Sequence, residues 1–209
     1  MTGPFANRTF ILGLTGSIGM GKSAVAAMLR ELGVPVFDAD AAVHELQGPG
    51  GALLPEIEAS FPGTTGTQGV DRPKLGAAVF GDAGKLARLE AIVHPAVASM
   101  RRSFMADHAD EPLVVFDIPL LFEKGATGVD AVAVVSAPAA AQRARVLARP
   151  GMTVDKFESI LRLQVPDAEK RARADYVIDT GLEMEETRRA VAAMVESIHK
   201  AVQSDTNQA

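Results

Sequence analysis

Short continuous apolar runs alternate along this chain with longer segments whose apolar residues recur at helical spacing. A continuous run, rather than a strict apolar–polar alternation, is typical of a strand buried on both faces of a parallel sheet. We therefore expect strands at residues 10–14, 34–37, 113–116, 131–135 and 176–178. The helical segments are residues 22–32, 39–46, 96–108, 139–148 and 183–202. This order predicts an α/β fold, an open parallel sheet flanked by helices.

Residues 47–95 and 142–173 do not follow this alternation. The first stretch has no good strand candidate, only helical segments separated by turns such as the Gly- and Pro-containing sequence at 61–66. We interpret it as a helical insertion. The second is a helix that breaks at Pro150 and Gly151 and resumes after Thr153, which suggests a helical hairpin.

Charge sets the second of these stretches apart. Residues 142–173 include eight basic and four acidic side chains, whereas the whole chain has a formal net charge of -5. A basic segment within an acidic chain indicates a local anionic ligand. The acidic whole argues against a general affinity for nucleic acid.

Composition narrows the class of protein further. The chain has 209 residues, 47% of them apolar, which is enough to bury a sizeable core. It has no cysteine, which excludes a disulfide framework, a thiolate zinc site and a cysteine nucleophile. The apolar run at 10–14 is too short for a signal peptide, and nothing approaches the roughly 20 apolar residues of a membrane span. We expect a soluble, cytoplasmic protein with no obligate protein partner.

The strongest motif joins the first expected strand to the first expected helix. Residues 16–23 read Gly-Ser-Ile-Gly-Met-Gly-Lys-Ser, the pattern G-x-x-x-x-G-K-[ST] of a phosphate-binding loop. Glycines let successive backbone N–H groups turn toward one anion, and the helix that follows adds its positive end. In this motif Lys22 reaches the β- and γ-phosphates, and the hydroxyl of Ser23 ligates Mg²⁺. The flanking strand and helix argue against an incidental glycine-rich turn, and we expect ATP with Mg²⁺ as the ligand.

Three acidic residues follow expected strands. Asp38 and Asp40 come after the second strand, and Asp117 comes after the third. Ligands of α/β sheets bind outside the carboxyl ends of the strands, and a kinase needs a carboxylate to accept the proton of the acceptor hydroxyl. The alternative is that Asp38 or Asp40 merely caps the helix that runs to Leu46.

Histidine and arginine supply further candidates. His94 precedes Pro95 at an expected helix boundary, where a local hydrogen-bonding role is as plausible as a functional one. Arg145 and Arg149 are four residues apart, hence on one face of a helix, and could converge on phosphates when a lid closes. The alternative is a solvated helix face with weak ion pairs.

The class of phosphate-loop protein is narrowed by what is missing. The chain has no Asn-Lys-x-Asp motif of the kind that reads guanine in GTPases, and it is short for a motor or transport ATPase. A small-metabolite kinase fits best. The rivals are a kinase of a nucleoside, shikimate or gluconate, and a module that only senses nucleotide; acceptor-dependent turnover separates them.

Several segments carry a family resemblance that covers nearly the whole chain, from Phe10 to about Ile198. These are the sequences at residues 14–23, 36–40 (Val-Phe-Asp-Ala-Asp), 89–95 (Leu-Glu-Ala-Ile-Val-His-Pro), 117–123 (Asp-Ile-Pro-Leu-Leu-Phe-Glu) and 174–179 (Ala-Asp-Tyr-Val-Ile-Asp). In this order they resemble the dephospho-CoA kinase family. The resemblance implies transfer of the γ-phosphoryl group of ATP to the ribose 3′-hydroxyl of dephospho-CoA, which is the last step of coenzyme A biosynthesis.

The resemblance also implies a three-part architecture. We expect a phosphate-loop nucleotide-binding core made of residues 8–46, 111–140 and 174–203. Residues 47–110 would be the helical insertion that binds the acceptor, and residues 141–173 would be the lid.

Site residues follow from the resemblance position by position. The expected catalytic residues are Asp40 as first choice of base, Asp38 as second, Lys22 and Arg149. The expected ATP-binding residues are Gly19, Met20, Gly21, Lys22, Ser23, Ala24, Arg145 and Arg149. The expected acceptor-side residues are Asp40, Arg72, His94, Asp117 and Gln164, with Gln164 in the lid region.

The chain departs from the family pattern at three places. Ala24 follows the loop where a second hydroxyl residue, Thr, is usual. The lid reads Arg149-Pro150-Gly151-Met152, without the acidic residue often found after the arginine. The last strand ends Asp179-Thr180 rather than Asp-Asn. These departures bear on adenine and lid contacts.

Overall fold

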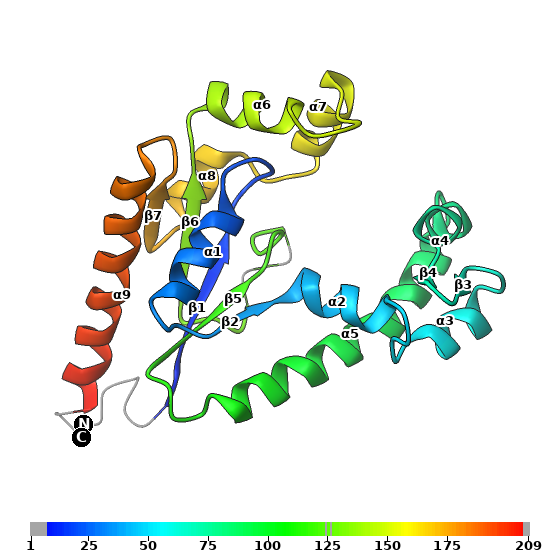
Figure 1. Ribbon diagram of the computed structural model, residues 1–209, viewed down its shortest axis with the longest axis horizontal. Coiled ribbons are helices and arrows are strands. Elements are labelled where there is room, and N and C mark those ends of the chain that lie inside the picture. Colours follow the sequence, from blue (N-terminus) through cyan, green and yellow to red (C-terminus); the bar gives the residue numbers. More distant parts are fainter. Residues whose placement is uncertain (1–7, 124, 126, 207–209) are drawn as a thin grey trace. The chain divides into compact units, whose positions relative to one another are not determined.

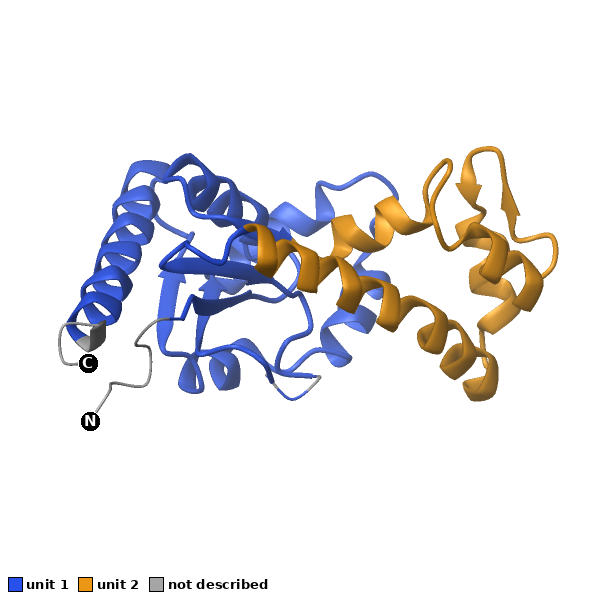
Figure 2. Cartoon of the chain, turned by 90° about the horizontal axis from the view of Figure 1, so that it is seen from below, with its two compact units in different colours: residues 1–37, 108–209 blue, residues 38–107 orange. Residues whose placement is uncertain are grey.

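The computed structural model describes residues 8–123, 125 and 127–206 of the chain (Figure 1). They divide into two compact units, Met1–Phe37 with His108–Ala209 as the first and Asp38–Asp107 as the second (Figure 2). Each unit has a hydrophobic core of its own.

The first unit is built on a five-stranded sheet in the order β2-β5-β1-β6-β7. β1 (Phe10–Thr15) lies at the centre, between β5 (Leu113–Asp117) and β6 (Ala131–Ser136). β2 (Val36–Asp38) and β7 (Tyr176–Asp179) form the two edges. β1 pairs in parallel with both neighbours, and β6 pairs in parallel with β7. The strand that enters the phosphate loop is therefore the central one.

Helices cover both faces of this sheet. α1 (Lys22–Glu31) and α9 (Met184–Thr206) pack against each other on one face. α8 (Asp167–Ala172) contacts β6, and α6 (Ala139–Leu147) contacts α7 (Val154–Arg162). Side chains of β6 alternate between two cores: Ala133 and Val135 join the core with α1 and α9, and Val132 and Val134 join a core with Leu121 and Phe122. Burial on both faces explains the continuous apolar runs.

The second unit is mostly helical. It contains α2 (Ala39–Gln47), α3 (Leu54–Ser60), α4 (Arg72–Val79) and the long α5 (Ala83–Asp107). Its core consists of Leu46, Leu53, Ile57, Phe61, Leu75 and Ile92. A small antiparallel hairpin joins α3 to α4, with strands β3 (Thr65–Gly66) and β4 (Gly69–Val70).

The expected core strands are confirmed, each within two residues of its observed ends. The β3–β4 hairpin was missed because two-residue strands leave no alternation to detect. The expected helix boundary at His94 and Pro95 is wrong, because α5 runs through Pro95. Proline removes one helical hydrogen bond and disfavours a helix, but packing of Ile92 and its neighbours in the second core holds this one together.

The boundary of the second unit differs from the expected one between residues 46 and 47. The observed boundary lies before α2, between Phe37 and Asp38, because α2 packs on α5 and its Leu46 lies in the second core. The break in the basic stretch is confirmed: α6 ends at Leu147, Gly151 has a φ of 73°, and Thr153 caps α7 by accepting the N–H of Lys156 at 3.3 Å. α8, which follows α7, was not expected.

Two of the helices, α5 and α9, are long enough to cross a bilayer. Neither they nor any other helix among the described residues is sufficiently apolar to do so.

Burial of Leu29 on α1 leads to a test of the first core. Leu29 is fully buried, whereas Leu32, at the end of the same helix, is 48% exposed. We expect Leu29→Ala to lower the free energy of unfolding by about 2–5 kcal/mol, because it leaves a cavity beneath α9. Leu32→Ala is the matched control and should change it by less than about 0.5 kcal/mol. Denaturant unfolding measures both, and equal effects would contradict the packing described.

Candidate active site

The phosphate loop joins β1 to α1 and is shaped by three glycines. A Cβ on Gly16 would lie 2.7 Å from the carbonyl oxygen of Val135, and one on Gly19 would lie 2.4 Å from the side chain of Val146. Gly19 and Gly21 have φ values of 77° and 87°, in the left-handed region that favours glycine. The loop is thus packed tightly between β6 and α6, and no residue with a side chain could replace these glycines without strain.

The N-terminus of α1 is open to an anion. Its N-cap, Gly21, provides no side-chain cap, and the first turn has no acidic residue. The N–H groups of Lys22 and Ser23 cannot find an acceptor within the helix, since they precede its first turn of hydrogen bonds. Together with the helix dipole they favour a bound phosphate.

Lys22 and Asp117 form an ion pair at the carboxyl ends of two neighbouring strands. The side chain of Asp117 is 3% exposed and that of Lys22 is 18% exposed. Asp117 ends β5, which pairs with β1, so the sheet itself brings the carboxylate to the loop. A buried carboxylate needs such a partner, because desolvation of an unpaired charge is costly.

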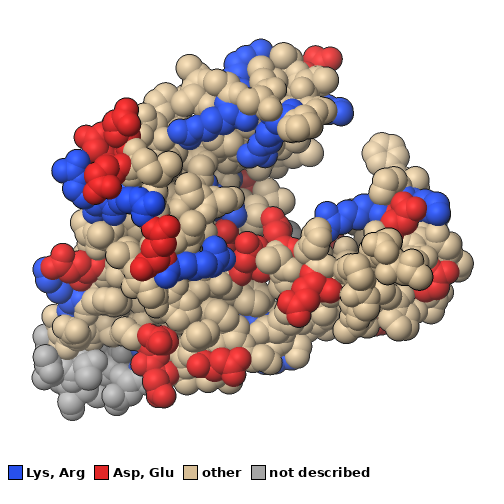
Figure 3. Space-filling view, viewed as in Figure 1, with Lys and Arg blue, Asp and Glu red and all other residues tan. Residues whose placement is uncertain are grey.

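The two expected lid arginines lie in different surroundings. The guanidinium of Arg145 donates to the hydroxyl and the carbonyl of Thr180, at 3.1 and 2.6 Å. The hydroxyl of Thr180 in turn donates to the carbonyl of Met20 in the phosphate loop, at 2.6 Å. Arg145 is therefore tied to the loop through Thr180. Arg149 lies two residues after the end of α6, and both arginines are exposed. Lys and Arg side chains gather over α6 and α7 (Figure 3).

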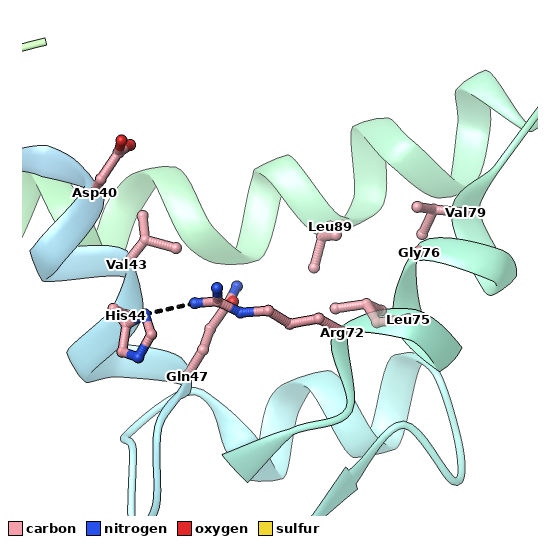
Figure 4. Close-up of a pocket in the computed structure, with 9 residues that line it drawn as sticks. All are labelled: Asp40, Val43, His44, Gln47, Arg72, Leu75, Gly76, Val79 and Leu89. Atoms are coloured by element: carbon pink, nitrogen blue, oxygen red, sulfur yellow. Dashed lines mark hydrogen bonds between the residues drawn. The ribbon is translucent and has the colours of Figure 1, made fainter. Parts of the chain in front are cut away.

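In the second unit, Asp38 and Asp40 have different roles in the local structure. The carboxylate of Asp38 caps α2 by accepting the N–H of Ala41 at 2.9 Å. Asp40 is exposed and lines a cavity of about 470 Å³ within this unit (Figure 4). Both residues were candidates for a cap, and the structure assigns the cap to Asp38.

The same cavity contains Arg72. Its guanidinium meets Nδ1 of His44 at 2.7 Å, so that nitrogen accepts a hydrogen bond from the arginine (Figure 4). Apolar side chains form much of the remaining wall: Val43, Leu75, Val79 and Leu89. A cation, a carboxylate and an apolar wall suit an anionic ligand with an apolar portion. His94, by contrast, is exposed on α5 and is not among the lining residues.

Some contacts of the site have no counterpart in the sequence predictions. Gln164, one of the expected acceptor-side residues, accepts the N–H of Ile18 in the phosphate loop, and Gln142, which was not predicted, donates to the carbonyl of Ile18. Lys170, counted above with the basic stretch, is fully buried and pairs with Glu123. Burial raises the pKa of the Glu123 carboxyl, but Lys170 and the N–H of Val165 outweigh it and hold that pKa below its usual value. Glu123 belongs to the family motif at residues 117–123, so the sequence drew attention to it. Nothing in the sequence indicated that its partner would be Lys170.

Comparison with known proteins supports one family. The family model described as dephospho-CoA kinase matches residues 10–186. A dephospho-CoA kinase of Novosphingobium aromaticivorans is 74% identical over 194 residues, which cover 92% of this chain and 96% of that protein. The chain belongs to the dephospho-CoA kinase family.

Solved structures show a similar fold. A crystal structure of TT1252 from Thermus thermophilus is 37% identical, has a TM-score of 0.79, and covers 90% of this chain and 97% of its own. Dephospho-CoA kinase from Campylobacter jejuni is 22% identical with a TM-score of 0.62, covering 92% and 98%, and shows the same fold. The family is one of kinases that complete coenzyme A biosynthesis, which implies ATP as co-substrate.

The residues around the loop fit a magnesium ion that arrives with ATP. No cluster of three or more His, Asp or Glu residues that could hold a metal by itself occurs in the described ranges. Mg²⁺ is commonly bound by one or two protein oxygens together with substrate phosphates and water. The exposed hydroxyl of Ser23, at the start of α1, is such an oxygen.

The Lys22–Asp117 pair can be tested by a double-mutant cycle. We expect Lys22→Met to reduce turnover by at least about a hundredfold, because it removes the cation that faces the transferred phosphoryl group. It should also lower the free energy of unfolding by about 1–3 kcal/mol, because the carboxylate of Asp117 stays buried. Lys22→Met with Asp117→Asn should regain much of that stability but no activity. Additive effects of the two changes on stability would disprove the pairing.

Proposed function

We propose that this chain transfers the γ-phosphoryl group of ATP to the ribose 3′-hydroxyl of dephospho-CoA, and that the cavity of the second unit receives the acceptor. The observation that carries the proposal is that one cavity is lined by both Asp40 and Arg72. Dephospho-CoA has a hydroxyl to be phosphorylated, a diphosphate and a long pantetheine chain. The carboxylate, the guanidinium and the apolar wall of the cavity match these parts in turn.

On the ATP side, positioning and electrostatic stabilisation do most of the work. The N–H groups at the start of α1 hold the phosphates, and the ammonium of Lys22 opposes the negative charge that develops on the transferred group. Mg²⁺, bound with the ATP phosphates and the Ser23 hydroxyl, would neutralise further charge. For Lys22 to reach the phosphates, they must compete with Asp117 for its ammonium group.

On the acceptor side, Asp40 is the proposed general base. Its carboxylate would take the proton of the ribose 3′-hydroxyl as that oxygen attacks the γ-phosphorus. Asp38 is the weaker candidate, because its carboxylate already accepts the N–H of Ala41. Arg72, held by His44, would bind the diphosphate of the acceptor through charge-assisted hydrogen bonds. The structure gives His94 no comparable contact, and we propose no chemical step for it.

The basic stretch is proposed to act as a lid over the nucleotide. Arg149 is exposed two residues after α6 and two residues before the left-handed Gly151, which can serve as a hinge. Its guanidinium would add a charge-assisted contact to the β- and γ-phosphates when the lid closes. Arg145 would contribute to ATP binding from its position beside Thr180, to which it is hydrogen-bonded.

We propose that the enzyme works in the cytoplasm and without an obligate protein partner. The absence of cysteine is compatible with a reducing compartment. A cavity formed entirely by residues of this chain also gives the acceptor a place without a second protein.

A coupled ADP-release assay tests the assigned reaction. Purified protein with ATP and Mg²⁺ should release ADP when dephospho-CoA is added, and little with shikimate, gluconate or nucleosides as acceptors. Mass spectrometry should find coenzyme A as the product. Equal turnover with another acceptor, or ADP release that does not depend on the acceptor, would contradict the assignment.

Substitution of the two neighbouring aspartates separates base from cap. We expect Asp40→Asn to lower kcat by about 10²–10⁴-fold with little change in KM for ATP, because the proton acceptor is lost in the transition state. Asp38→Asn retains an oxygen that can cap α2 and should keep most of its kcat. Steady-state kinetics with both substrates decide the matter. A crippled Asp38→Asn beside a near-normal Asp40→Asn would reverse the assignment.

The lid role of Arg149, which follows α6, is tested against an arginine within that helix. We expect Arg149→Ala to reduce kcat/KM for ATP by at least about tenfold, which requires only ~1.4 kcal/mol of transition-state stabilisation. Arg143→Ala is the control, because Arg143 is likewise exposed but lies within α6, six residues before Arg149. The kcat/KM of this control for ATP should stay within about twofold of the parent value. Equal, small effects of both changes would mean that α6 presents an ordinary solvated face.

A further inference from the structure

Both backbone polar groups of one residue in the phosphate loop, Ile18, are held by glutamine side chains. The N–H of Ile18 donates to Oε1 of Gln164 at 3.1 Å, and the carbonyl of Ile18 accepts from Nε2 of Gln142 at 2.8 Å. Both bonds are partly buried. The backbone of Ile18 is therefore turned away from a ligand, and its orientation is set by the two glutamines.

These glutamines come from opposite ends of the stretch proposed as the lid. Gln142 lies in α6, and Gln164 follows α7. α6 also packs directly against the loop, because a Cβ on Gly19 would meet the side chain of Val146 at 2.4 Å. The segment that leaves the phosphate loop region through α6 thus returns to the same loop residue after α7.

The part of this segment that follows α7 is held by a further contact, which we call the anchor: the side chain of Glu123. Oε1 of Glu123 accepts the N–H of Val165, the residue after Gln164, at 2.8 Å. The same oxygen lies 2.9 Å from Nζ of Lys170 in α8. Glu123 therefore joins the loop after β5 to the residues on both sides of Pro166, where the chain enters α8.

Burial makes this anchor sensitive to the loss of either charge. The side chain of Lys170 is fully buried and that of Glu123 is 14% exposed. Asp167, nearby in the chain, accepts a hydrogen bond from the hydroxyl of Ser136 at 2.8 Å, which ties the start of α8 to the end of β6. An ammonium group this deeply buried is tolerated only beside a carboxylate, so removal of one partner leaves the other as an unpaired buried charge.

We propose that Gln142 and Gln164 are positioning residues that hold the phosphate loop at Ile18, and that the Glu123–Lys170 pair fixes the segment carrying Gln164. Neither glutamine needs to touch ATP. They fix the two peptide groups on either side of Ile18, and so determine where the N–H groups of the following residues point. The inference deepens the proposed function, since it assumes that the loop binds the phosphates of ATP.

The first experiment measures ATP binding by titration calorimetry, without acceptor, for Gln164→Leu. This change keeps the approximate size of the side chain and removes the acceptor for the N–H of Ile18. We expect ATP affinity to fall by at least tenfold, while the thermal midpoint of the free protein stays close to that of the parent. Leu163→Ala is the control, because Leu163 is the adjacent residue and is 81% exposed. It should leave ATP affinity within twofold.

ATP affinity of Gln164→Leu within twofold of the parent would overturn the inference. A loss of ATP affinity that comes with an equally large fall in the thermal midpoint would also overturn it, since that pattern indicates general damage to the fold. Failure of the proposed function looks different: the parent would bind ATP but show no turnover that depends on dephospho-CoA. The comparison of the variants in ATP binding still holds in that case.

The anchor is tested by rescue. Lys170→Met leaves the Glu123 carboxylate without its partner, and both the thermal midpoint and ATP affinity should fall. Adding Glu123→Gln removes that charge but keeps an oxygen for the N–H of Val165, so the double variant should recover both quantities. A double variant that regains its thermal midpoint but not its ATP affinity would overturn the anchoring role, as would Lys170→Met with unchanged ATP affinity.

Discussion

The backbone of residues 16–23 must present its N–H groups to a highly charged anion, and much of the first unit depends on this requirement. The loop can turn only where side chains are absent, since Gly16 abuts the backbone of Val135 and Gly19 abuts Val146. It also needs a rigid support, which the central position of β1 between two parallel neighbours provides. The contacts of Thr180, Gln142 and Gln164 then fix the carbonyls of Met20 and Ile18 and the N–H of Ile18.

Two lysine side chains of the first unit, one partly and one fully buried, each form an ion pair with a carboxylate. Lys22 is paired with Asp117 at the mouth of the loop, and Lys170 with Glu123 beside α8. The two carboxylates begin and end the same motif, Asp-Ile-Pro-Leu-Leu-Phe-Glu. One pair lies where a phosphate can compete for the lysine, and the other lies in a closed interior where no ligand can. The same chemistry thus serves a changeable contact in one place and a permanent one in the other.

In the proposed function, the second unit recognises an acceptor with both charged and apolar parts. Its cavity combines Asp40 and the Arg72–His44 pair with apolar side chains from α2, α4 and α5. Asp38, two residues before Asp40, is occupied as the cap of α2. Since a cap fixes the first turn of a helix, Asp38 also sets the direction in which Asp40 leaves the helix.

The sequence by itself determined the α/β class, the core strands, the phosphate loop and the family, because these depend on local apolar runs and on motifs contiguous in the chain. It left the choice between Asp38 and Asp40 open, since a cap and a base call for the same residue type. It could not show that Lys170 is buried against Glu123, that Thr180 holds Arg145 and Met20, or that two glutamines meet at Ile18. Nor could it show that α5 continues through Pro95, or that the second unit begins before α2. Each was decided by packing between residues far apart in the chain, where burial and hydrogen-bond partners, rather than residue type, select the outcome.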